Sequence, residues 1–491
     1  MKNKVTVGLH TFYHDGSICV FDHNTEEIKY LKFERITGVK HQFHNDYHSW
    51  IKYLNYLGYS EKDVDVVFLA DTSNLKKISD FPEPIVMYPL DHHICHHWST
   101  GGFNSLVFDN IGSQYESLSI FKKNQCQLKL TQKAHSSLSI DLNRLWHTWF
   151  VRNNKELFQD EINNVDFAGY TMALHGFGKD CSQHLITPSF TKEYTDNAII
   201  NYMQFKEKMN SQDETFVMNS FVTSLHFYWY KKIKNHLSRL FKKNYTIKVS
   251  GGVGHNIVLN TLLKKDFPNL DATPHCGDEG LSIGALRWGV WTMHRKKLKL
   301  NFTKMKQQDE NLGKATSSII KKIAEDLAQN KIVLWGQGWG EIGPRALGYR
   351  SILMNPCTKN GKEIINNKIK KRIWFRPYGA SVLKNKYHQY FDLPYESDWM
   401  LYQAEVKDKD KFKNITHVDG TCRIQTVHES NETFNELLYE FEKLTGYPVF
   451  LNTSMNLPGN PIAGTKNQIT NMFKNSQADI LAIGNERMTH G

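Results

Sequence analysis

VTVGLHTFYHDGSICVFD, residues 5–22, is the stretch that indicates the fold class. Its first part places apolar residues at Val5, Val7 and Leu9, and this alternation predicts a β-strand. YHDG (13–16) predicts a tight turn, because an Asp-Gly pair readily adopts the backbone angles of hairpin turns. The segment after the turn predicts a second strand, so we expect an N-terminal hairpin.

Apolar runs and glycine turns alternate further along the chain. VDVVFLAD (64–71) predicts a buried strand from its β-branched residues. KVSGGVGHN (248–256) predicts a strand and a glycine turn leading into a helix at IVLNTLLKK (257–265), and GLSIGALRWGVWTMH (280–294) predicts another helix. This mixture predicts an α/β protein. We find no internal repeat in the amino-acid sequence.

The length of 491 residues predicts two or three domains, since single cores rarely grow to this size. The polar, weakly periodic segment over 300–316 predicts a linker. SIIKKIAEDLAQNKIVLWGQG (318–338) then begins a new helix-then-strand unit. We therefore expect one domain over 1–312 and another over 313–491.

The composition excludes several classes of protein. Seven scattered cysteines without a C-x-x-C pair argue against a disulfide framework and against a cysteine zinc site. No run of eighteen apolar residues and no signal-peptide pattern occurs, so we expect a soluble, cytoplasmic protein, in the host cytoplasm if the gene is viral.

The net charge of +11 is partly clustered, in KKIKNHLSRLFKK (231–243), HRKKLKLNFTKMK (294–306) and NNKIKKRIWFR (366–376). Such clusters are typical of a solvated surface, or of a groove that binds a polyanion such as nucleic acid. Charge alone leaves both interpretations open.

Four histidines gather in DHHICHHWST (91–100). A helix would place His92 and His96 on one face, because residues four apart face the same side. Asp109 ends an apolar run and Asp278 lies in a turn, where each carboxylate would be accessible. Two imidazoles with carboxylates suit Fe²⁺, Mn²⁺ or Zn²⁺. A structural or surface role for the histidines is the alternative.

Two further patterns bear on chemistry. His14 and Asp15 lie on the predicted hairpin turn, where a histidine beside a carboxylate suits a general base, or is incidental to an Asp-Gly turn. The turn SGGVG (250–254) lies before a helix and so suits anion binding, although it matches no standard phosphate-loop pattern.

The C-terminal part contains a second constellation. GEIGPRALGYRSIL (340–353), KKRIWFRPYGASVL (370–383), THVDGTCRIQT (416–426) and FLNTSMNLPGNPIAGT (450–465) place arginines among glycines, hydroxyls and amides. Guanidinium groups around a shared pocket suit the recognition of phosphate or carboxylate.

Together these strings resemble the O-carbamoyltransferase family of the nodulation and cephamycin-type enzymes. The resemblance runs nearly end to end and includes E-R-x-x-x-x-K-H (34–41), H-H-x-x-H (92–96), G-D-x-G (277–280), GPRALG-x-RS and LNTS-x-N. It implies an actin/Hsp70-like ATPase-fold domain over 1–312 and an α+β YrdC-like domain over 313–491.

The resemblance also implies the chemistry and the cofactors. The YrdC-like domain would convert carbamoyl phosphate and ATP into carbamoyl adenylate. The first domain would then transfer the carbamoyl group to an acceptor hydroxyl with the help of a divalent metal ion, Fe²⁺ most often, while Mg²⁺ accompanies ATP.

Position by position, the resemblance implies four groups of site residues. His14 with Asp15 would be the base that deprotonates the acceptor. The metal ligands would be His92, His96, Asp109 and Asp278. The adenylate would contact Gly251, Gly252 and Asn256. Carbamoyl phosphate and ATP would bind Arg345, Lys371, Arg376, Arg423, Ser454 and Asn456.

The chain departs from the family pattern at Tyr170, where relatives usually carry a lysine for which Lys179 is a candidate substitute. The acceptor stays open between a small molecule such as a sugar or an antibiotic and a 5-hydroxymethylpyrimidine such as 5-hydroxymethylcytosine in DNA. A threonylcarbamoyl-type tRNA-modifying transferase and a nucleotide-gated actin/Hsp70-fold binding module are the alternative functions. The oligomeric state is open, with a homodimer as one option.

Overall fold

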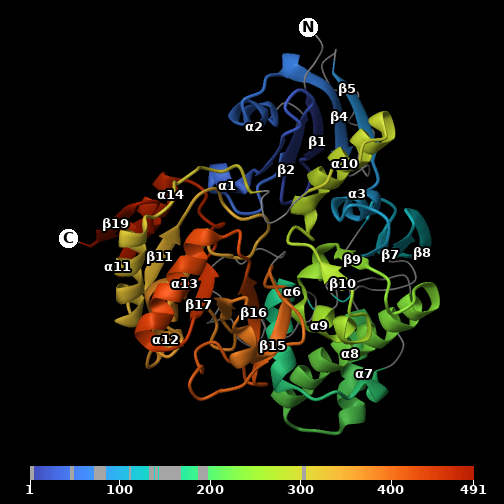
Figure 1. Cartoon of the computed structure of the whole chain (residues 1–491). Helices are drawn as coiled ribbons and strands as arrows, with labels where there is room; N and C mark the ends of the chain where they lie inside the picture. The colour runs from blue at the N-terminus through green and yellow to red at the C-terminus, as the bar shows by residue number, and fades with distance from the viewer. Residues whose placement is uncertain are drawn as a thin grey trace.

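The described residues form three β-sheets, two in the N-terminal part and one in the C-terminal part (Figure 1). The computed structural model describes residues 5–44, 49–70, 85–109, 112–131, 138, 142, 167–185, 197–300 and 306–490. Helices cover the sheets, which confirms the predicted α/β class.

The first sheet has the strand order β3-β2-β1-β4-β5. Its strands are β1 (Val5–His10), β2 (Ser17–Asp22), β3 (Ile28–Lys32), β4 (Val64–Ala70) and β5 (Val86–Leu90). The short helices α1 (Glu34–Thr37) and α2 (Ile51–Tyr56) accompany it. Helix α10 (Leu281–His294) packs against β1 although it follows the second sheet in sequence. Gly8 permits this approach, because a Cβ there would lie 2.1 Å from Ser282 O.

The second sheet has the order β10-β9-β6-β7-β8. Its strands are β6 (Ser105–Phe108), β7 (Glu116–Lys122), β8 (Gln125–Thr131), β9 (Ile247–Ser250) and β10 (Leu270–Ala272). Its helices are α6 (Phe167–Met172), α7 (Asn197–Met209), α8 (Glu214–Leu240) and α9 (Ile257–Asp266). Helix α3 (His92–Ser99) joins the two sheets.

Both N-terminal sheets have the same topology. In each, three consecutive strands form an antiparallel meander, and two later strands run parallel to the first. The topology therefore repeats, although the amino-acid sequence shows no repeat. A pattern of buried apolar runs is enough to specify a strand, so two sheets can share a topology without shared residues.

The third sheet has nine strands in the order β14-β15-β16-β13-β17-β12-β11-β18-β19. They are β11 (Val333–Gly336), β12 (Arg350–Met354), β13 (Gly379–Leu383), β14 (Phe391–Asp392), β15 (Tyr402–Val406), β16 (Thr421–Val427), β17 (Val449–Ser454), β18 (Ile480–Ile483) and β19 (Glu486–Thr489). Its helices are α11 (Ser317–Ala328), α12 (Gly361–Ile365), α13 (Glu432–Thr445) and α14 (Lys466–Lys474).

The C-terminal part packs into the apolar core around the second N-terminal sheet. Phe375 and Leu401 belong to the apolar core that surrounds the second sheet. Asn260 Nδ2 donates to Leu401 O at 3.2 Å, and Gln403 N donates to Thr261 Oγ1 at 3.0 Å. The predicted domain boundary falls between α10 and α11 and stays a prediction, and residues 301–305 of the predicted linker lie outside the described residues.

Several local predictions are confirmed. The predicted hairpin is β1–β2, the strand over 64–71 is β4, and the helix over 280–294 is α10. The glycine turn leads from β9 into α9 as expected. In the described part of the chain, no helix combines the length and the apolar character needed to cross a membrane.

Candidate functional site

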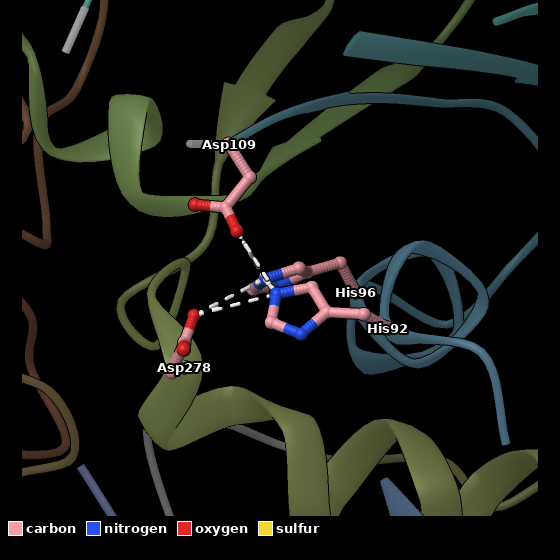
Figure 2. A group of neighbouring side chains, drawn as sticks. All are labelled: His92, His96, Asp109 and Asp278. Atoms are coloured by element: carbon pink, nitrogen blue, oxygen red, sulfur yellow. Dashed lines mark hydrogen bonds and ion pairs between the residues drawn. The ribbon is translucent and has the colours of Figure 1, made fainter. Parts of the chain in front are cut away.

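Four buried side chains converge between the two N-terminal sheets (Figure 2). Asp91 caps the N-terminus of helix α3, and its side chain accepts from Ile94 N. The helix carries His92 and His96 on one face, because they are four residues apart. Asp109 follows strand β6, and Asp278 begins a short 3₁₀ turn, η9 (Asp278–Gly280), before α10. One ligand atom from each of these histidines and aspartates lies within 4.8 Å of the others.

The donor set fits a divalent metal ion. His92 Nε2 lies 2.9 Å from Asp109 Oδ2, and His96 Nε2 lies 3.5 Å from Asp278 Oδ1. The two Nε2 atoms are themselves 3.1 Å apart, so both imidazoles face the same point. Burial raises the pKa of Asp278, but the imidazoles, His14 and His92 foremost, outweigh it and hold the pKa below its ordinary value, against the charge of Asp109. A shared cation would offset the repulsion between these two buried carboxylates.

The other two histidines of α3 face away from this centre. His93 Nδ1 lies 2.8 Å from Ser119 Oγ, and His97 Nδ1 lies 2.7 Å from Ser105 Oγ. Burial lowers the pKa of both, to about 4 for His97. These two are neutral packing residues, so the helix separates candidate ligands from core histidines.

His14 lies on the hairpin turn, and its ring contacts the candidate metal ligand Asp278. Its Nδ1 donates to Asp15 Oδ2 at 2.9 Å, and its Nε2 lies 3.5 Å from Asp278 Oδ2. Burial lowers the pKa of His14, but the carboxylates of Asp278 and Asp15 raise it to about 9. A base must be neutral, and a cation bound at Asp278 would offset that carboxylate and bring the pKa of His14 down.

Asp15 is held by a network of charged groups around it, of which Lys32 was not predicted from the sequence. Lys32 Nζ lies 2.6 Å from Asp15 Oδ1 and 3.0 Å from Glu34 Oε1, and His41 Nδ1 lies 2.9 Å from Asp15 Oδ1. Asp15, Glu34 and His41 could themselves hold a metal ion, but the Lys32 ammonium already supplies a cation there. Lys32 is the last residue of strand β3 and belongs to none of the quoted motifs.

The predicted adenylate residues bind protein groups. Gly251 has a φ of 92°, and a Cβ there would lie 2.3 Å from Phe108 O, so this position requires glycine. Gly252 N donates to Asp109 Oδ1 at 2.8 Å. Asn256 Oδ1 accepts from Leu259 N at 3.0 Å, which caps α9. The adenylate role of Gly251, Gly252 and Asn256 stays a prediction.

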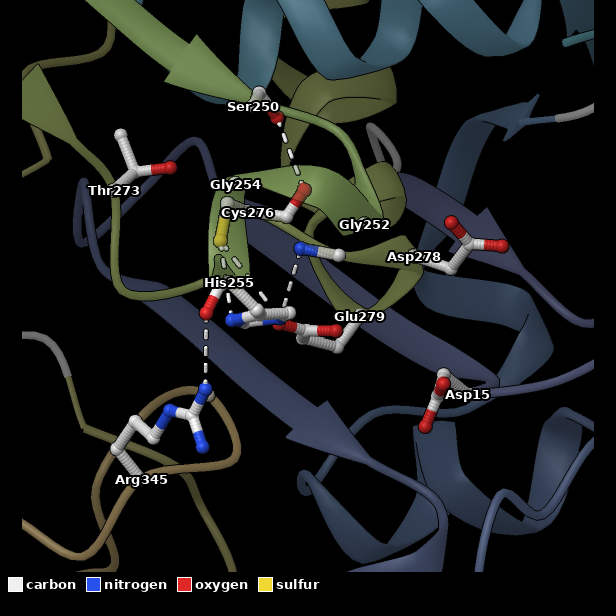
Figure 3. Close-up of polar contacts among 12 residues, drawn as sticks. Asp15, Ser250, Gly252, Gly254, His255, Thr273, Cys276, Asp278, Glu279 and Arg345 are labelled. Carbon is white, nitrogen blue, oxygen red and sulfur yellow. Dashed lines mark hydrogen bonds and ion pairs between the residues drawn. The ribbon is translucent and has the colours of Figure 1, made fainter. Parts of the chain in front are cut away.

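The glycine turn also contacts a cysteine, a histidine and a C-terminal arginine (Figure 3). Cys276 Sγ lies 3.2 Å from His255 Nδ1, and His255 Nε2 lies 3.4 Å from Glu279 Oε1. Burial raises the pKa of the fully buried Cys276 thiol, so it packs as a neutral group. Arg345 Nη2 donates to His255 O at 3.2 Å, which joins the C-terminal part to this turn.

A cavity of about 1130 Å³, which we call the central cavity, lies between the two halves of the chain. Lys32, Glu34 and His41 line it on the N-terminal side, one contact away from Asp15. Several cations line the C-terminal side, and five of them form what we call the cationic cluster: Arg345, Lys370, Arg372, Arg376 and Arg423.

The cationic cluster holds positive charge that is buried at Lys370 and partly buried at the four arginines, without matching carboxylates. Within the described part of the chain, no ion pair joins these five residues to an acidic side chain. Burial lowers the pKa of Arg345, Arg372 and Arg423, to about 10 for Arg372, and neighbouring cations lower the values of Arg372 and Arg423 further. An entering anion would remove this electrostatic cost. The cavity is therefore suited to phosphate groups.

The predicted residues Ser454 and Asn456 line the cavity, and their oxygens accept hydrogen bonds from Lys370. Lys370 Nζ donates to Ser454 O at 2.9 Å, Asn456 O at 2.9 Å and Asn456 Oδ1 at 2.7 Å. The predicted Lys371 also lines the cavity but is exposed. Residues 366–370 form a π-helical turn, which displaces side chains relative to an α-helix. The sequence therefore could not distinguish Lys370 from its neighbour.

The three basic clusters of the sequence have different surroundings. The cluster at 366–376 lines the central cavity through Lys370, Arg372 and Arg376. In the cluster at 231–243, Lys234 Nζ lies 2.8 Å from Asp266 Oδ1. The cluster at 294–306 is described only in part. Much of the charge at 366–376 thus faces a cavity and not an outer surface.

Comparison with known proteins links the C-terminal part to a named family. Residues 324–490 match the family model described as "Carbamoyltransferase C-terminus". An uncharacterized protein of Methanocaldococcus jannaschii is 28% identical over 469 residues, which cover 84% of this chain and 75% of that protein. Nodulation protein NolNO of Sinorhizobium fredii is 31% identical over 268 residues, which cover 48% of this chain and 39% of that protein.

Nodulation protein U of Rhizobium tropici is 35% identical over 230 residues, covering 43% of this chain and 38% of that protein. The chain thus spans less than half the length of these two nodulation proteins. Among solved structures, full-length HypF in its phosphate- and nucleotide-bound form is similar with a TM-score of 0.39 and 11% identity, over 60% of this chain and 48% of that one.

An activator of a 2-hydroxyisocaproyl-CoA dehydratase from Clostridium difficile has a TM-score of 0.35 and 12% identity, over 60% of this chain and 98% of that one. TM-scores of this size do not establish a shared fold. The family-model match is more specific, because residues 324–490 build the third sheet and carry the cationic cluster. Over these residues the chain is similar to the carbamoyltransferase C-terminus, and over less than half of its length it is similar to the nodulation proteins NolNO and U.

Proposed function

We propose that this protein is an ATP- and metal-dependent O-carbamoyltransferase. It uses carbamoyl phosphate and ATP to make carbamoyl adenylate, and it transfers the carbamoyl group to an acceptor hydroxyl. The observation that carries this proposal is the central cavity, which joins an unneutralised cationic cluster at one side to the Lys32–Asp15–His14 network at the other.

The cationic cluster suits the adenylate-forming half of the reaction. Carbamoyl phosphate, ATP and water give carbamoyl adenylate, phosphate and pyrophosphate, so every reactant except water carries phosphate. The guanidinium fork binds phosphate oxygens in pairs and stabilises charge that develops on the leaving groups. Arg345, Arg376 and Arg423 supply such forks, and Lys370 adds charge from behind Ser454 and Asn456.

The side of the cavity lined by Lys32, which contacts Asp15 and through it His14, suits the transfer half of the reaction. The acceptor oxygen attacks the carbamoyl carbon, AMP leaves, and the hydroxyl proton passes to His14 Nε2 while Asp15 orients the ring through Nδ1. His92, His96, Asp109 and Asp278 would hold the metal ion, which supplies Lewis-acid stabilisation when bound. Two imidazoles with two carboxylates suit Fe²⁺, Mn²⁺ or Zn²⁺.

The fold supports the same assignment of the two half-reactions to the two parts of the chain. We assign the two N-terminal sheets of equal topology to the two halves of an actin/Hsp70-like fold, and the mixed nine-stranded sheet to a YrdC-like domain. The boundary at 312/313 goes with this assignment. The support is the repeated strand order in the first part and the family match over 324–490 in the second.

The acceptor that fits these contacts is a small alcohol. The basic cluster at 366–376 faces the cavity, and Lys234 of the cluster at 231–243 is paired with Asp266, so less positive charge is available for a nucleic-acid backbone. A 5-hydroxymethylpyrimidine in DNA is the acceptor that the experiment below must exclude.

The test separates the two half-reactions. The purified chain, loaded with Fe²⁺, is incubated with ATP and carbamoyl phosphate, and pyrophosphate release is measured. Mass spectrometry then detects the gain of one carbamoyl group on a panel of sugars and aminoglycosides or on hydroxymethylcytosine-containing duplex DNA. His14→Asn should keep the release of pyrophosphate and lower transfer by roughly 10²–10⁴-fold, the usual effect of losing a general base.

Each outcome decides one part of the proposal. Pyrophosphate release that does not depend on carbamoyl phosphate would contradict the adenylation step. Transfer to DNA alone would replace the small alcohol by a DNA base. Full transfer by His14→Asn would remove His14 from the reaction while leaving adenylation intact.

A further inference from the structure

Two arginines of the cationic cluster lie against tyrosine rings. Arg376 Cζ lies 3.9 Å from the centroid of the Tyr170 ring, and Arg372 Cζ lies 4.9 Å from that of Tyr378. An aromatic face attracts a guanidinium without using its N–H groups. This contact differs from an ion pair, because a carboxylate would take the same donors that a phosphate needs.

Tyr170 reaches the cavity from the opposite half of the molecule. It lies on α6, which neighbours β15 and β16 of the C-terminal sheet (Figure 1). Tyr170 is partly buried and packs against the core around the second sheet, as do Ile373, Phe177 and Trp399. The N-terminal part therefore completes the wall of a pocket whose arginines come from the C-terminal part.

His417 fastens the segment that carries Tyr170. His417 Nε2 lies 2.8 Å from Ala173 O, and since a carbonyl only accepts, Nε2 carries the proton. Gly176 allows the close approach, because a Cβ there would lie 2.7 Å from His417 Cδ2. Phe177 packs edge-on against His417 and Trp374, with ring centroids 5.4 and 5.5 Å apart. The position of Tyr170 is thus set by contacts across the two halves.

We propose that Tyr170 is a positioning residue of the anion pocket, whose ring holds the Arg376 guanidinium toward the phosphate groups of the substrate. Without the ring, Arg376 faces the like charges of Lys370, Arg372 and Arg423. Burial lowers the pKa of each of these three groups, and the charge of Arg376 lowers it further. A lysine at position 170 would add to that repulsion. The identity of the substrate rests on the proposed function, whereas the need for an anion rests on the cluster alone.

The experiment measures binding of inorganic pyrophosphate to the full-length chain by calorimetry, together with KM and kcat for pyrophosphate release. Tyr170→Leu should weaken pyrophosphate binding and raise KM by about 3- to 30-fold, the range expected for a partly desolvated cation–π contact. The value of kcat should change less. Tyr170→Phe keeps the ring face and should bind as the unaltered chain does.

Tyr439→Leu is the matched control. Its ring lies 5.9 Å from Lys386 Nζ, it is partly exposed, and it does not line the central cavity, so binding should be unchanged. Thermal unfolding of each variant checks that the fold is retained. In a double-mutant cycle, Tyr170→Leu should add nothing to Arg376→Ala, because both remove the same contact.

Several results would overturn the inference. These are unchanged binding by Tyr170→Leu, equal loss in Tyr170→Phe and Tyr170→Leu, additive effects in the cycle, or no binding of pyrophosphate to the unaltered chain. Failure of the proposed function has a different signature. In that case pyrophosphate binding follows the expected series of variants, but carbamoyl phosphate does not stimulate pyrophosphate release.

Discussion

At the scale of single residues, the chemistry depends on which atoms of a side chain remain available. Asp15 contacts three cations or imidazoles, Lys32, His14 and His41, and this holds its pKa well below the usual range although burial raises it. The ammonium group of Lys370 likewise donates its hydrogen bonds to Ser454 and Asn456. Both groups therefore act through their charge and through the neighbours that they orient.

The candidate metal centre gives a prediction at this scale. The double variant His92→Ala/His96→Ala should lose the bound metal, since losing even one outer hydrogen-bond partner typically costs about 10–100-fold in metal affinity. Metal content per chain is measured by inductively coupled plasma mass spectrometry after loading with Fe²⁺ and desalting.

The same helix offers the control. His93→Asn/His97→Asn alters two buried histidines of α3 that bind serines, and it should retain the metal. Circular dichroism checks that both double variants keep their helices. Metal retained at full stoichiometry by His92→Ala/His96→Ala would contradict the ligand assignment.

At the scale of elements, single contacts join distant segments. Asp326 on α11 accepts from Arg487 Nε at 2.7 Å and from Arg487 Nη2 at 2.8 Å, which ties this helix to strand β19. Lys331 Nζ adds a third contact at 2.9 Å. Burial raises the pKa of Asp326, but Arg487 and Lys331 outweigh burial and lower it.

Asp326→Asn should lower the free energy of unfolding at pH 7 by about 1–3 kcal/mol, the range for hydrogen bonds to charged groups. The pKa of Asp326 is lower in the folded state than its ordinary value of 3.8, so the stabilisation is complete above about pH 4. It is lost as the pH falls through the lower folded value. Urea unfolding at pH 7 and pH 3 should therefore show a smaller difference between the two proteins at pH 3.

Glu325→Gln is the control for this prediction, because Glu325 is the exposed neighbour of Asp326 on the same helix. It should change the free energy of unfolding by no more than about 0.5 kcal/mol. A difference between Asp326→Asn and the unaltered chain that stays constant with pH would show that the ion pair is not its source.

At the scale of the whole molecule, the two halves share both a core and a cavity. Phe375 and Leu401 are buried among residues of the second N-terminal layer, and Arg345 bonds the carbonyl of His255. The side of the central cavity that carries the cationic cluster and the side lined by Lys32, Glu34 and His41 are therefore held in a fixed relation. Separating the halves would open the cavity and expose apolar surface.

A fragment of residues 313–491 tests this point. Exposure of Phe375 and Leu401 should cost about 1.5–3 kcal/mol per side chain, so the fragment should melt at a lower temperature than the full chain and bind the dye ANS. The same fragment with Phe375→Gln and Leu401→Gln should bind less dye. A fragment with the melting temperature of the full chain and no dye binding would contradict the shared core.

Many features follow from local sequence pattern. The hairpin at 5–22, strand β4, helix α10 and the helical face that carries His92 and His96 were predictable, because strand and helix periods are properties of neighbouring residues. The carbamoyltransferase resemblance followed from ordered motifs in the same way. Most of the predicted site residues lie in motifs, whereas Lys32 lies in none and was not predicted.

Tertiary structure decided what local pattern cannot contain. Strand β1 is buried on both faces because α10 returns to cover it, and Tyr170 meets Arg376 although about two hundred residues separate them. Lys370 ends a π-helical turn, and its ammonium group binds Ser454 and Asn456, whereas the sequence pattern had favoured its neighbour Lys371. Sequence pattern determines the elements and the resemblance to carbamoyltransferases, because both depend on residues close together in the chain. The packing of distant segments determines the cavity, its charge and the positions of its side chains.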